Sequence, residues 1–211
     1  ALAGLGITVD ADLLALPNEV ACLFEANDKQ QALFRPLPRP LIGIGLGAGN
    51  RMKALNPEQL LSLSQQLLDN TSGTLVLVGA AADQPVAAQL CAVMPAGRCL
   101  DTTNQWCLAD LPSLLAGLDC FVGVDSGATY IADAVGVAVV DFMGPANADD
   151  QRPIGCHALV IRSNEPCAPC SHAFDAPYRC RLGTRACIVG FPVEEIVRQV
   201  KALLAVRDKA C

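Results

Sequence analysis

Short apolar runs alternate along this chain with longer segments of helical periodicity. The runs have the length of buried strands and lie at 41–46, 74–78, 98–100, 121–124, 137–142 and 158–162. Between them, helically spaced apolar residues predict helices at 83–93, 108–118, after residue 126, and at 192–208. Strands that alternate with helices predict a parallel sheet covered on both faces, an α/β fold of the Rossmann-like, doubly wound type.

The start of one further helix is marked by its local residues. Asn56 is a favourable cap, Pro57 suits the first helical position, and Gln59 can complete a capping box. Its apolar face continues through Leu60, Leu63 and Leu67. We therefore expect a helix that begins at residue 57.

The first 40 residues carry weaker signals. A short helix is expected near 12–16 and a strand near 20–24, before the Pro-rich stretch 35–40. Such a stretch favours a stiff, extended linker. Because the chain also begins without Met or a leader-like segment, we expect a piece of a longer protein. Residues 1–40 would be the end of a missing N-terminal lobe with its linker, and 41–211 the main domain.

Gly-rich or polar turns follow three of the predicted strands, at 47–53, 79–83 and 125–130. The carboxyl ends of parallel strands share one sheet edge, where ligands of such folds bind. The turn 125–130 also opens a helix, whose N-terminal N–H groups attract anions, with Asp125 or Ser126 as its cap. The three turns together predict a phosphate or diphosphate site.

Individual side chains in these turns have both functional and ordinary interpretations. Lys53 supplies a positive charge for a diphosphate, or it is a solvated surface lysine. Asp125 accepts hydrogen bonds from sugar hydroxyls, or it only caps the helix. Trp106 stacks on a nucleobase or packs in the core, and Asp83 binds a ribose hydroxyl or serves as a helix N-terminal acid.

Composition narrows the class of protein. Hydrophobic residues make up 52% of the chain and aromatic residues only 4%, as expected for an aliphatic core within a parallel sheet. The formal net charge of −6 argues against non-specific nucleic-acid binding, which depends on a basic surface. Acidic residues interrupt every long apolar stretch, so we expect no transmembrane segment.

Eleven cysteines are many for 211 residues. Seven are scattered, several of them within apolar runs, which is typical of packed free thiols in a reducing cytoplasm. The other four form a C-x2-C-x9-C-x6-C pattern within a Cys-rich loop, 156–187, and are Cys167, Cys170, Cys180 and Cys187. This pattern allows a structural zinc site, disulfides formed after purification, or free thiols.

The segment that begins at Asp125 also resembles a known family. Asp-Ser-Gly-x-x-x-x-Ala-x-Ala-x-Gly, followed by a strand and Phe-x-Gly-Pro, is similar to the donor-binding signature of glycosyltransferase family 9. ADP-heptose:lipopolysaccharide heptosyltransferases are its best-known members. The resemblance extends from about residue 41 to the end of the chain. One position departs from the pattern, because Tyr130 stands where the family usually has His.

This resemblance implies the C-terminal, donor-binding lobe of a GT-B glycosyltransferase. The implied activity transfers heptose from ADP-heptose to a lipopolysaccharide core without a required cofactor. The lobe would act in the cytoplasm, or peripherally at the inner face of the inner membrane. The general base would belong to the missing lobe, so no catalytic residue is expected here and the chain alone would be inactive. The implied donor-binding residues are Gly47, Ala48, Gly49, Asn50, Lys53, Trp106, Asp125, Ser126, Gly127, Ala128 and Tyr130.

Three other functions stay open at this point. A degenerate relative could bind the donor without catalysis, and another GT-B nucleotide-sugar enzyme, such as an epimerase, could share the signature. A nicotinamide-binding domain is disfavoured because the chain lacks G-x-G-x-x-G.

Overall fold

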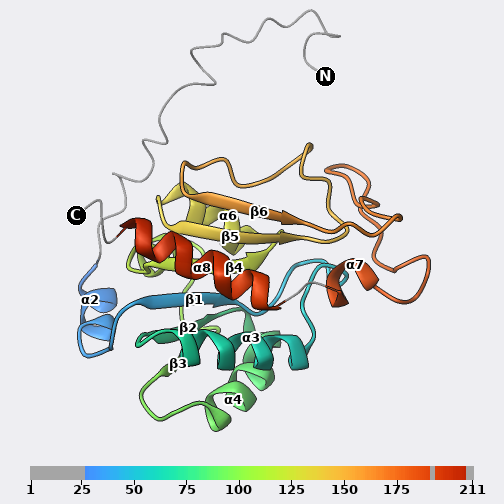
Figure 1. Cartoon of the computed structure of the whole chain (residues 1–211). Helices are drawn as coiled ribbons and strands as arrows, with labels where there is room; N and C mark the ends of the chain where they lie inside the picture. The colour runs from blue at the N-terminus through green and yellow to red at the C-terminus, as the bar shows by residue number, and fades with distance from the viewer. Residues whose placement is uncertain (1–26, 191–192, 208–211) are drawn as a thin grey trace, which may run out of the picture.

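A computed structural model describes residues 27–190 and 193–207 (Figure 1). Its centre is a six-stranded, all-parallel sheet with the strand order β3-β2-β1-β4-β5-β6. The strands are β1 (Leu41–Gly45), β2 (Thr74–Val78), β3 (Cys99–Asp101), β4 (Cys120–Val124), β5 (Ala138–Met143) and β6 (Ala158–Arg162). The predicted doubly wound, Rossmann-like fold is therefore confirmed. The expected helix near 12–16 and strand near 20–24 lie outside the described residues.

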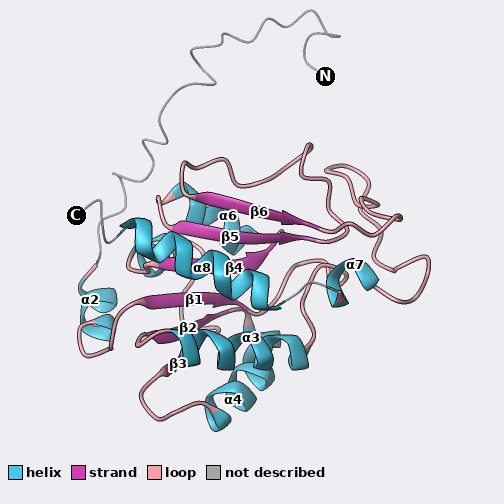
Figure 2. Cartoon of the chain, viewed as in Figure 1, coloured by secondary structure: helices cyan, strands magenta, loops and turns pink. Residues whose placement is uncertain are grey.

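Helices cover both faces of the sheet (Figure 2). One core contains residues of α3 (Pro57–Asn70), α4 (Gln84–Val93) and α8 (Val193–Arg207). The opposite core contains residues of α2 (Asp28–Phe34), α5 (Leu111–Ala116) and α6 (Gly127–Ala134). Within β1, Ile42 and Ile44 belong to the first core and Leu41 to the second, as alternation along a strand requires. The four central strands are fully buried, which explains why they read as continuous apolar runs.

Several predicted boundaries agree closely with the structure. The runs at 74–78 and 158–162 are strands with those bounds, and α8 begins and ends one residue inside the predicted 192–208. At α3, Asn56 accepts from the Gln59 backbone N–H, and the Gln59 side chain accepts from the Asn56 N–H. The predicted capping box is thus confirmed.

Two predicted helices differ in their bounds. The helix expected at 108–118 is the shorter α5, because 107–110 form a turn in which Leu108 is exposed. The helix expected from residue 83 is preceded by a 3-10 turn, η3 (Ala81–Asp83). A one-turn helix, α7 (Ala186–Val189), was not predicted.

The residues just before β1 pack on the domain. Phe34 of α2 is buried in the core shared with α5 and α6, and Arg39 forms an ion pair with Asp119. The division at residue 40 stays a prediction, because packing alone does not define a domain boundary.

The order of the strands fixes where a ligand can bind. Successive strands run from β1 toward β3 on one side and from β4 toward β6 on the other, so the chain changes direction between β1 and β4. Crevices form beyond the carboxyl ends of the strands at such a switch point. The turns at 47–53 and 125–130 follow these two strands. No helix within the described residues is long and apolar enough to cross a bilayer.

Candidate functional site

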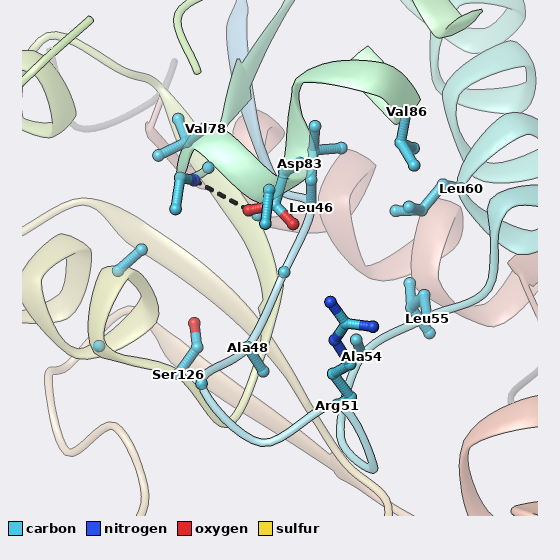
Figure 3. Close-up of a pocket in the computed structure, with 18 of the residues that line it drawn as sticks. Leu46, Ala48, Arg51, Ala54, Leu55, Leu60, Val78, Asp83, Val86 and Ser126 are labelled. Atoms are coloured by element: carbon cyan, nitrogen blue, oxygen red, sulfur yellow. Dashed lines mark hydrogen bonds between the residues drawn. The ribbon is translucent and has the colours of Figure 1, made fainter. Parts of the chain in front are cut away.

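A cavity of about 770 Å³ lies beyond the carboxyl ends of β1, β2 and β4 (Figure 3). Residues from all three predicted turns line it, together with part of the 102–114 segment. The structure thus brings together most of the expected site residues, namely Gly47, Ala48, Gly49, Trp106, Ser126, Gly127 and Ala128. Asn50, Lys53, Asp125 and Tyr130 do not line the cavity, and three of them form a polar network beside it.

Five glycines line the cavity, and three of them, Gly47, Gly49 and Gly127, belong to the predicted donor-binding residues. A Cβ atom added at Gly49 or Gly127 would meet no heavy atom within 4 Å, so both backbones face open space. At Gly47, an added Cβ would lie 2.6 Å from the Asp83 carboxylate. Gly47 is therefore needed because Asp83 approaches it, whereas Gly49 and Gly127 leave room for a ligand.

Asp83 itself lies on the cavity wall. One oxygen of its carboxylate accepts a hydrogen bond from the Ala80 backbone N–H at 2.8 Å. This contact closes the turn after β2, as expected for an acid at the start of a helix. A carboxylate retains further acceptor capacity after one such bond, so the side chain can also receive a hydroxyl donor.

The cavity also contains cations that the sequence analysis did not assign to the site. Arg51 is exposed on the cavity, and in the described part of the chain its guanidinium has no hydrogen-bond or ion-pair partner. Arg185 lines the cavity too, but its guanidinium donates to the carbonyls of Met52 and Ala54. Arg51 is thus available to a ligand, while Arg185 holds the loop after β1. A cation within a Gly-rich loop was the signal that could have identified Arg51.

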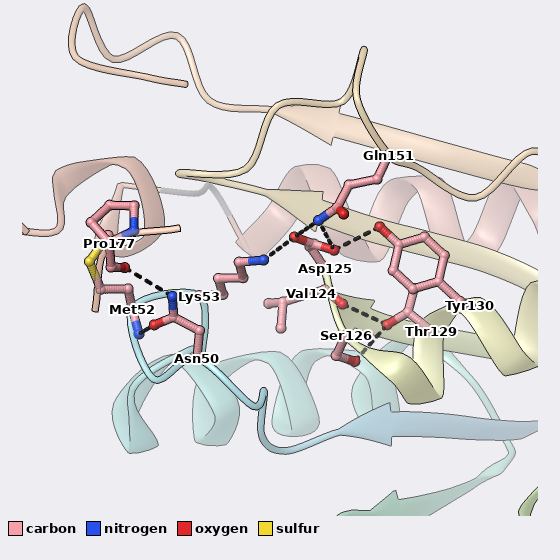
Figure 4. A network of polar contacts seen from close by, with 10 residues as sticks. All are labelled: Asn50, Met52, Lys53, Val124, Asp125, Ser126, Thr129, Tyr130, Gln151 and Pro177. Carbon is pink, nitrogen blue, oxygen red and sulfur yellow. Dashed lines mark hydrogen bonds and ion pairs between the residues drawn. The ribbon is translucent and has the colours of Figure 1, made fainter. Parts of the chain in front are cut away.

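A buried polar network adjoins the cavity (Figure 4). The Lys53 ammonium donates to Asp125 at 2.5 Å, and side-chain exposures of 12% and 3% show that Asp125 is buried and that Lys53 is largely covered. The Tyr130 hydroxyl donates to the other Asp125 oxygen at 2.7 Å, and the Gln151 amide lies 2.9 and 3.1 Å from the two oxygens. Lys53 is therefore not a solvated surface lysine.

Of the two expected caps for the new helix, Asp125 and Ser126, the structure places Ser126 at the N-cap position. The Asp125 carboxylate is occupied by Lys53, Tyr130 and Gln151. The Ser126 hydroxyl also forms no cap hydrogen bond, and lies 3.1 Å from the Thr129 hydroxyl. Side chains thus leave the first N–H groups of α6 uncapped at the cavity.

Tyr130 acts as a neutral donor in this network. Burial of the ring and its hydrogen bond to the Asp125 carboxylate raise the pKa of Tyr130 above its ordinary value. The hydroxyl therefore keeps its proton, so Tyr130 supplies Asp125 with a hydrogen bond at the position where the family signature usually has His.

Asn50 has a structural role in the loop after β1. Its side-chain oxygen accepts from the Met52 N–H at 3.0 Å, and its amide donates to the Pro177 carbonyl at 2.9 Å. These contacts fold the loop and connect it to the Cys-rich loop.

Trp106 lies between the core and the cavity. The ring is half-buried against the core shared with α5 and α6, and it also lines the cavity. The Lys29 ammonium lies 3.9 Å from the ring centroid, within the range of a cation–π contact. Its indole N–H is buried and has no partner among the described residues.

The four cysteines of the C-x2-C-x9-C-x6-C pattern are free thiols that influence one another. Burial is the main cause that raises the pKa of Cys170 and of Cys187, and neighbouring thiols of the pattern raise both further. Backbone N–H groups, that of Arg185 first, lower the pKa of Cys180. Nevertheless, within residues 27–190 and 193–207 no three His, Cys, Asp or Glu side chains are arranged to hold a metal ion.

The sheet order and the cavity at its switch point define a Rossmann-like α/β domain. The profile of glycosyltransferase family 9 (heptosyltransferase) matches residues 12–178, so the chain belongs to this family. The resemblance stated from the signature at Asp125 is thereby confirmed.

Individual relatives agree with this assignment. Over 92 residues the chain is 32% identical to lipopolysaccharide heptosyltransferase 1 of Pseudomonas aeruginosa. This matched segment covers 44% of this chain and 25% of the relative. The fold of this chain matches that of E. coli ADP-heptose lps heptosyltransferase II with a TM-score of 0.70 at 21% sequence identity. The match covers 87% of this chain and 54% of the E. coli chain. A family 9 glycosyltransferase from Veillonella parvula gives 0.68 at 18% identity, covering 89% and 52%. The chain therefore spans about half the length of these structures and a quarter of the curated relative.

Proposed function

We propose that this chain is the donor-binding lobe of a heptosyltransferase-like glycosyltransferase, and that its cavity binds a nucleoside diphosphate sugar. The observation that carries the proposal is the cavity at the β1/β4 switch point, which is lined by the open backbone at Gly49 and Gly127 and by Arg51, whose guanidinium has no partner among the described residues. ADP-heptose is the donor that the family suggests, and structures of related heptosyltransferases hold ADP or an ADP-heptose analogue.

The diphosphate binds between the loop at 47–53, which follows β1, and the turn at 125–130, which follows β4. The N-terminus of α6 supplies backbone N–H groups, but such a terminus contributes only about 0.3 to 2 kcal/mol to anion binding. The cations close to the turn add the remaining attraction, with Arg51 on the cavity and Lys53 beside it. Arg51 suits a planar, bidentate contact with phosphate oxygens, and Lys53 a point charge.

The nucleoside occupies the part of the cavity near Trp106. The indole offers a flat apolar surface for the base, next to Leu108 and Leu111. Asp83 lines the same cavity from the turn after β2, where its carboxylate can accept hydrogen bonds from ribose hydroxyls. The sugar then extends toward the turn after β4, which Asp125 holds in place through its contacts with Lys53, Tyr130 and Gln151.

The transfer reaction needs groups outside this chain. The described cations and the α6 N-terminus stabilise the leaving diphosphate, which is the part of the chemistry that this lobe supplies. An inverting transfer also needs a base for the acceptor hydroxyl, and we assign that base and the lipopolysaccharide core acceptor to an N-terminal lobe. The same proposal includes the division of the chain into residues 1–40 and 41–211. It also includes a location in the cytoplasm, peripheral at the inner face of the inner membrane.

The experiment is titration calorimetry of the chain with ADP, UDP and NAD. We expect ADP to bind more tightly than the other two and Arg51→Ala to weaken it. Arg179→Ala is a matched control, because this arginine does not line the cavity. Absence of ADP binding up to roughly millimolar concentration, with the fold verified by circular dichroism, would overturn the proposal.

A second experiment tests the role of the missing lobe. The chain is incubated with ADP-heptose and truncated lipopolysaccharide, and ADP release is compared with that of an intact heptosyltransferase. We expect none above background, because base catalysis alone contributes about 10² to 10⁴-fold. Acceptor-dependent ADP release would mean that the base lies within this chain. A degenerate, binding-only relative would instead stay inactive after the missing lobe is restored.

A metal ion in the Cys-rich loop is a separate proposal. Its support is the pattern Cys167, Cys170, Cys180 and Cys187, the mutual influence of these thiols, and the lowered pKa of Cys180, which favours the thiolate form that binds metals. The glycosyltransferase TibC of enterotoxigenic E. coli, which shares the fold at a TM-score of 0.58 and 16% identity, is described as iron-containing. Zinc is the metal suggested by four thiolates in this chain.

A further inference from the structure

Asp141 is a buried carboxyl group that the proposed binding site does not use. It lies in the middle of β5, its exposure is 0%, and neither carboxyl oxygen has a hydrogen-bond partner in the described residues. An ionised carboxylate without a partner is very costly to bury, so such a group takes up a proton. Burial first, and the nearby Asp125 charge second, raise the pKa of Asp141 to about 8.

The strand register places Asp141 beneath the donor turn. Val140 and Phe142 belong to the core on the α3 and α8 side, whereas Val139 belongs to the core on the α6 side. Asp141 therefore faces α6, as Val139 does. Its partner on β4 is Gly123, and Asp125 follows Gly123 by two positions on the same side of the chain.

The charges that face Asp141 come from three neighbouring segments. Asp125 and Asp133 raise its pKa, while the Lys53 ammonium lowers it. Asp133, on α6, is itself held by the backbone N–H groups of Ile154 and Gly155 at 2.9 and 3.0 Å. Tyr130, also on α6, stays neutral. The positive charge of Lys53 thus offsets part of the negative charge that Asp125 and Asp133 place near Asp141.

We propose that Asp141 is a positioning residue that holds a proton beneath Asp125, so that the donor turn carries one negative charge rather than two when a diphosphate competes for Lys53. This inference rests on the proposed function. A diphosphate brings negative charge toward Lys53 and weakens its effect on the two carboxyl groups. The neutral form of Asp141 then becomes more favourable, and an ionised Asp141 takes a proton from solvent. Asp125 keeps its hydrogen bonds from Tyr130 and Gln151 without a second carboxylate to repel it.

The mechanism predicts that ADP binding is linked to proton uptake. Near pH 8, where a part of Asp141 is ionised, binding should take up as much as about half a proton per ADP. Phosphate groups titrate near pH 6, so the ligand itself contributes little there. Above this pH, the affinity of the wild-type chain should fall by up to about tenfold per pH unit.

The test is titration calorimetry with ADP near pH 8, in buffers that differ in ionisation enthalpy, on the wild-type chain and on Asp141→Asn. Asparagine keeps the shape of the neutral acid but cannot exchange this proton. We expect proton uptake in the wild type, none in the variant, and an ADP affinity of the variant that changes less with pH. Equal proton uptake by both proteins, or ADP binding to the wild type without uptake, would overturn the inference and leave the proposed function intact. Failure of the wild type to bind ADP would overturn both.

A measurement on the wild type alone covers the case in which the variant does not fold. Infrared spectroscopy should show the carbonyl band of a protonated carboxyl group at neutral pH, lost only as the pH passes about 8. If all carboxyl groups are ionised at neutral pH, Asp141 does not hold a proton and the inference fails.

Discussion

The ammonium of Lys53 lies 2.5 Å from the carboxylate of Asp125, and this contact joins the loop after β1 to the turn after β4. The two residues are 72 positions apart in the chain. Both sides of the switch point are therefore linked by a charge pair that is largely removed from solvent. Removal of one partner from such a pair is more damaging than loss of the pair, because a buried charge remains unpaired.

Substitution of Lys53 should destabilise the fold as well as weaken ligand binding. Lys53→Met leaves the Asp125 carboxylate without its cation, and we expect a loss of about 3 to 5 kcal/mol in the free energy of unfolding. Lys53→Arg should recover part of both properties, since it restores the charge with a different shape. Urea denaturation and ADP titration measure the two effects. Arg162→Ala, which breaks the exposed pair with Asp149, is the control and should change stability by less than about 1 kcal/mol.

Another residue that donates a hydrogen bond to Asp125 should replace Tyr130 in part. Tyr130→Phe removes the hydroxyl that donates to Asp125, and the loss should be about 1 to 3 kcal/mol in the free energy of unfolding. Tyr130→His introduces the residue that the family signature usually has, and should recover part of the loss through a ring N–H. If the Phe and His variants have the same stability and ADP affinity, the hydrogen bond to Asp125 has no role.

Gly127 offers a test of ligand contact that is separate from stability. Gly127→Ala adds a methyl group into open space, so the fold should be retained while ADP binds less tightly. The comparison is Gly123→Ala, whose added Cβ would lie 2.5 Å from the Thr129 hydroxyl and should lower stability. Thermal denaturation and calorimetry on both variants measure this contrast. Unchanged ADP affinity in Gly127→Ala would mean that the ligand does not approach this turn.

Asp141 gives the stability of the protein a distinct pH dependence. Its pKa is about 8 in the folded chain against an ordinary value of 3.8, so between these values the folded state binds more protons than the unfolded state. Stability therefore falls as the pH rises through this window, at up to about 1.4 kcal/mol per pH unit, and this contribution levels off above the folded pKa. Asp141→Asn should remove it. Urea denaturation of both proteins across the window gives the difference, and parallel curves would contradict the assignment.

The metal proposal for the Cys-rich loop has a direct measurement. It predicts about one zinc ion per chain by elemental analysis of protein purified under reducing conditions, and loss of the metal in Cys180→Ser. Cys107→Ser is a control outside the pattern, because Cys107 is an exposed thiol in another loop. Metal-free protein with four thiols that react with an alkylating reagent would end the proposal.

The sequence identified those parts of the molecule that depend on near neighbours in the chain. The central strands are covered on both faces, so their composition alone marked them, and the Asn56 and Gln59 pair marked the start of α3. The role of Asp125 was missed because two of its three partners, Lys53 and Gln151, come from distant segments. Local spacing can suggest a cap, but it carries no information on a lysine that folding brings to the same carboxylate.

Asp141 shows a second limit of sequence reasoning. In the sequence it only interrupts an apolar run, which gives no indication of its environment. Its properties arise from the strand register, which sets it beside Gly123 and under α6. Arg51 differs, because its Gly-rich loop was recognised, and the structure had only to show that its guanidinium has no partner among the described residues.

The loop after β1 is held in place by hydrogen bonds to the Cys-rich loop, which lies more than a hundred residues further along the chain. Asn50 donates to the carbonyl of Pro177, and Arg185 donates to carbonyls of the loop, over separations of 127 to 133 residues. A chain cut after β6 would retain every strand of the sheet and still lose these hydrogen bonds. It would also lose α8, whose Ile196, Val197 and Val200 belong to one of the two cores. The residues that follow the last strand are therefore needed both for the core and for the shape of the ligand loop.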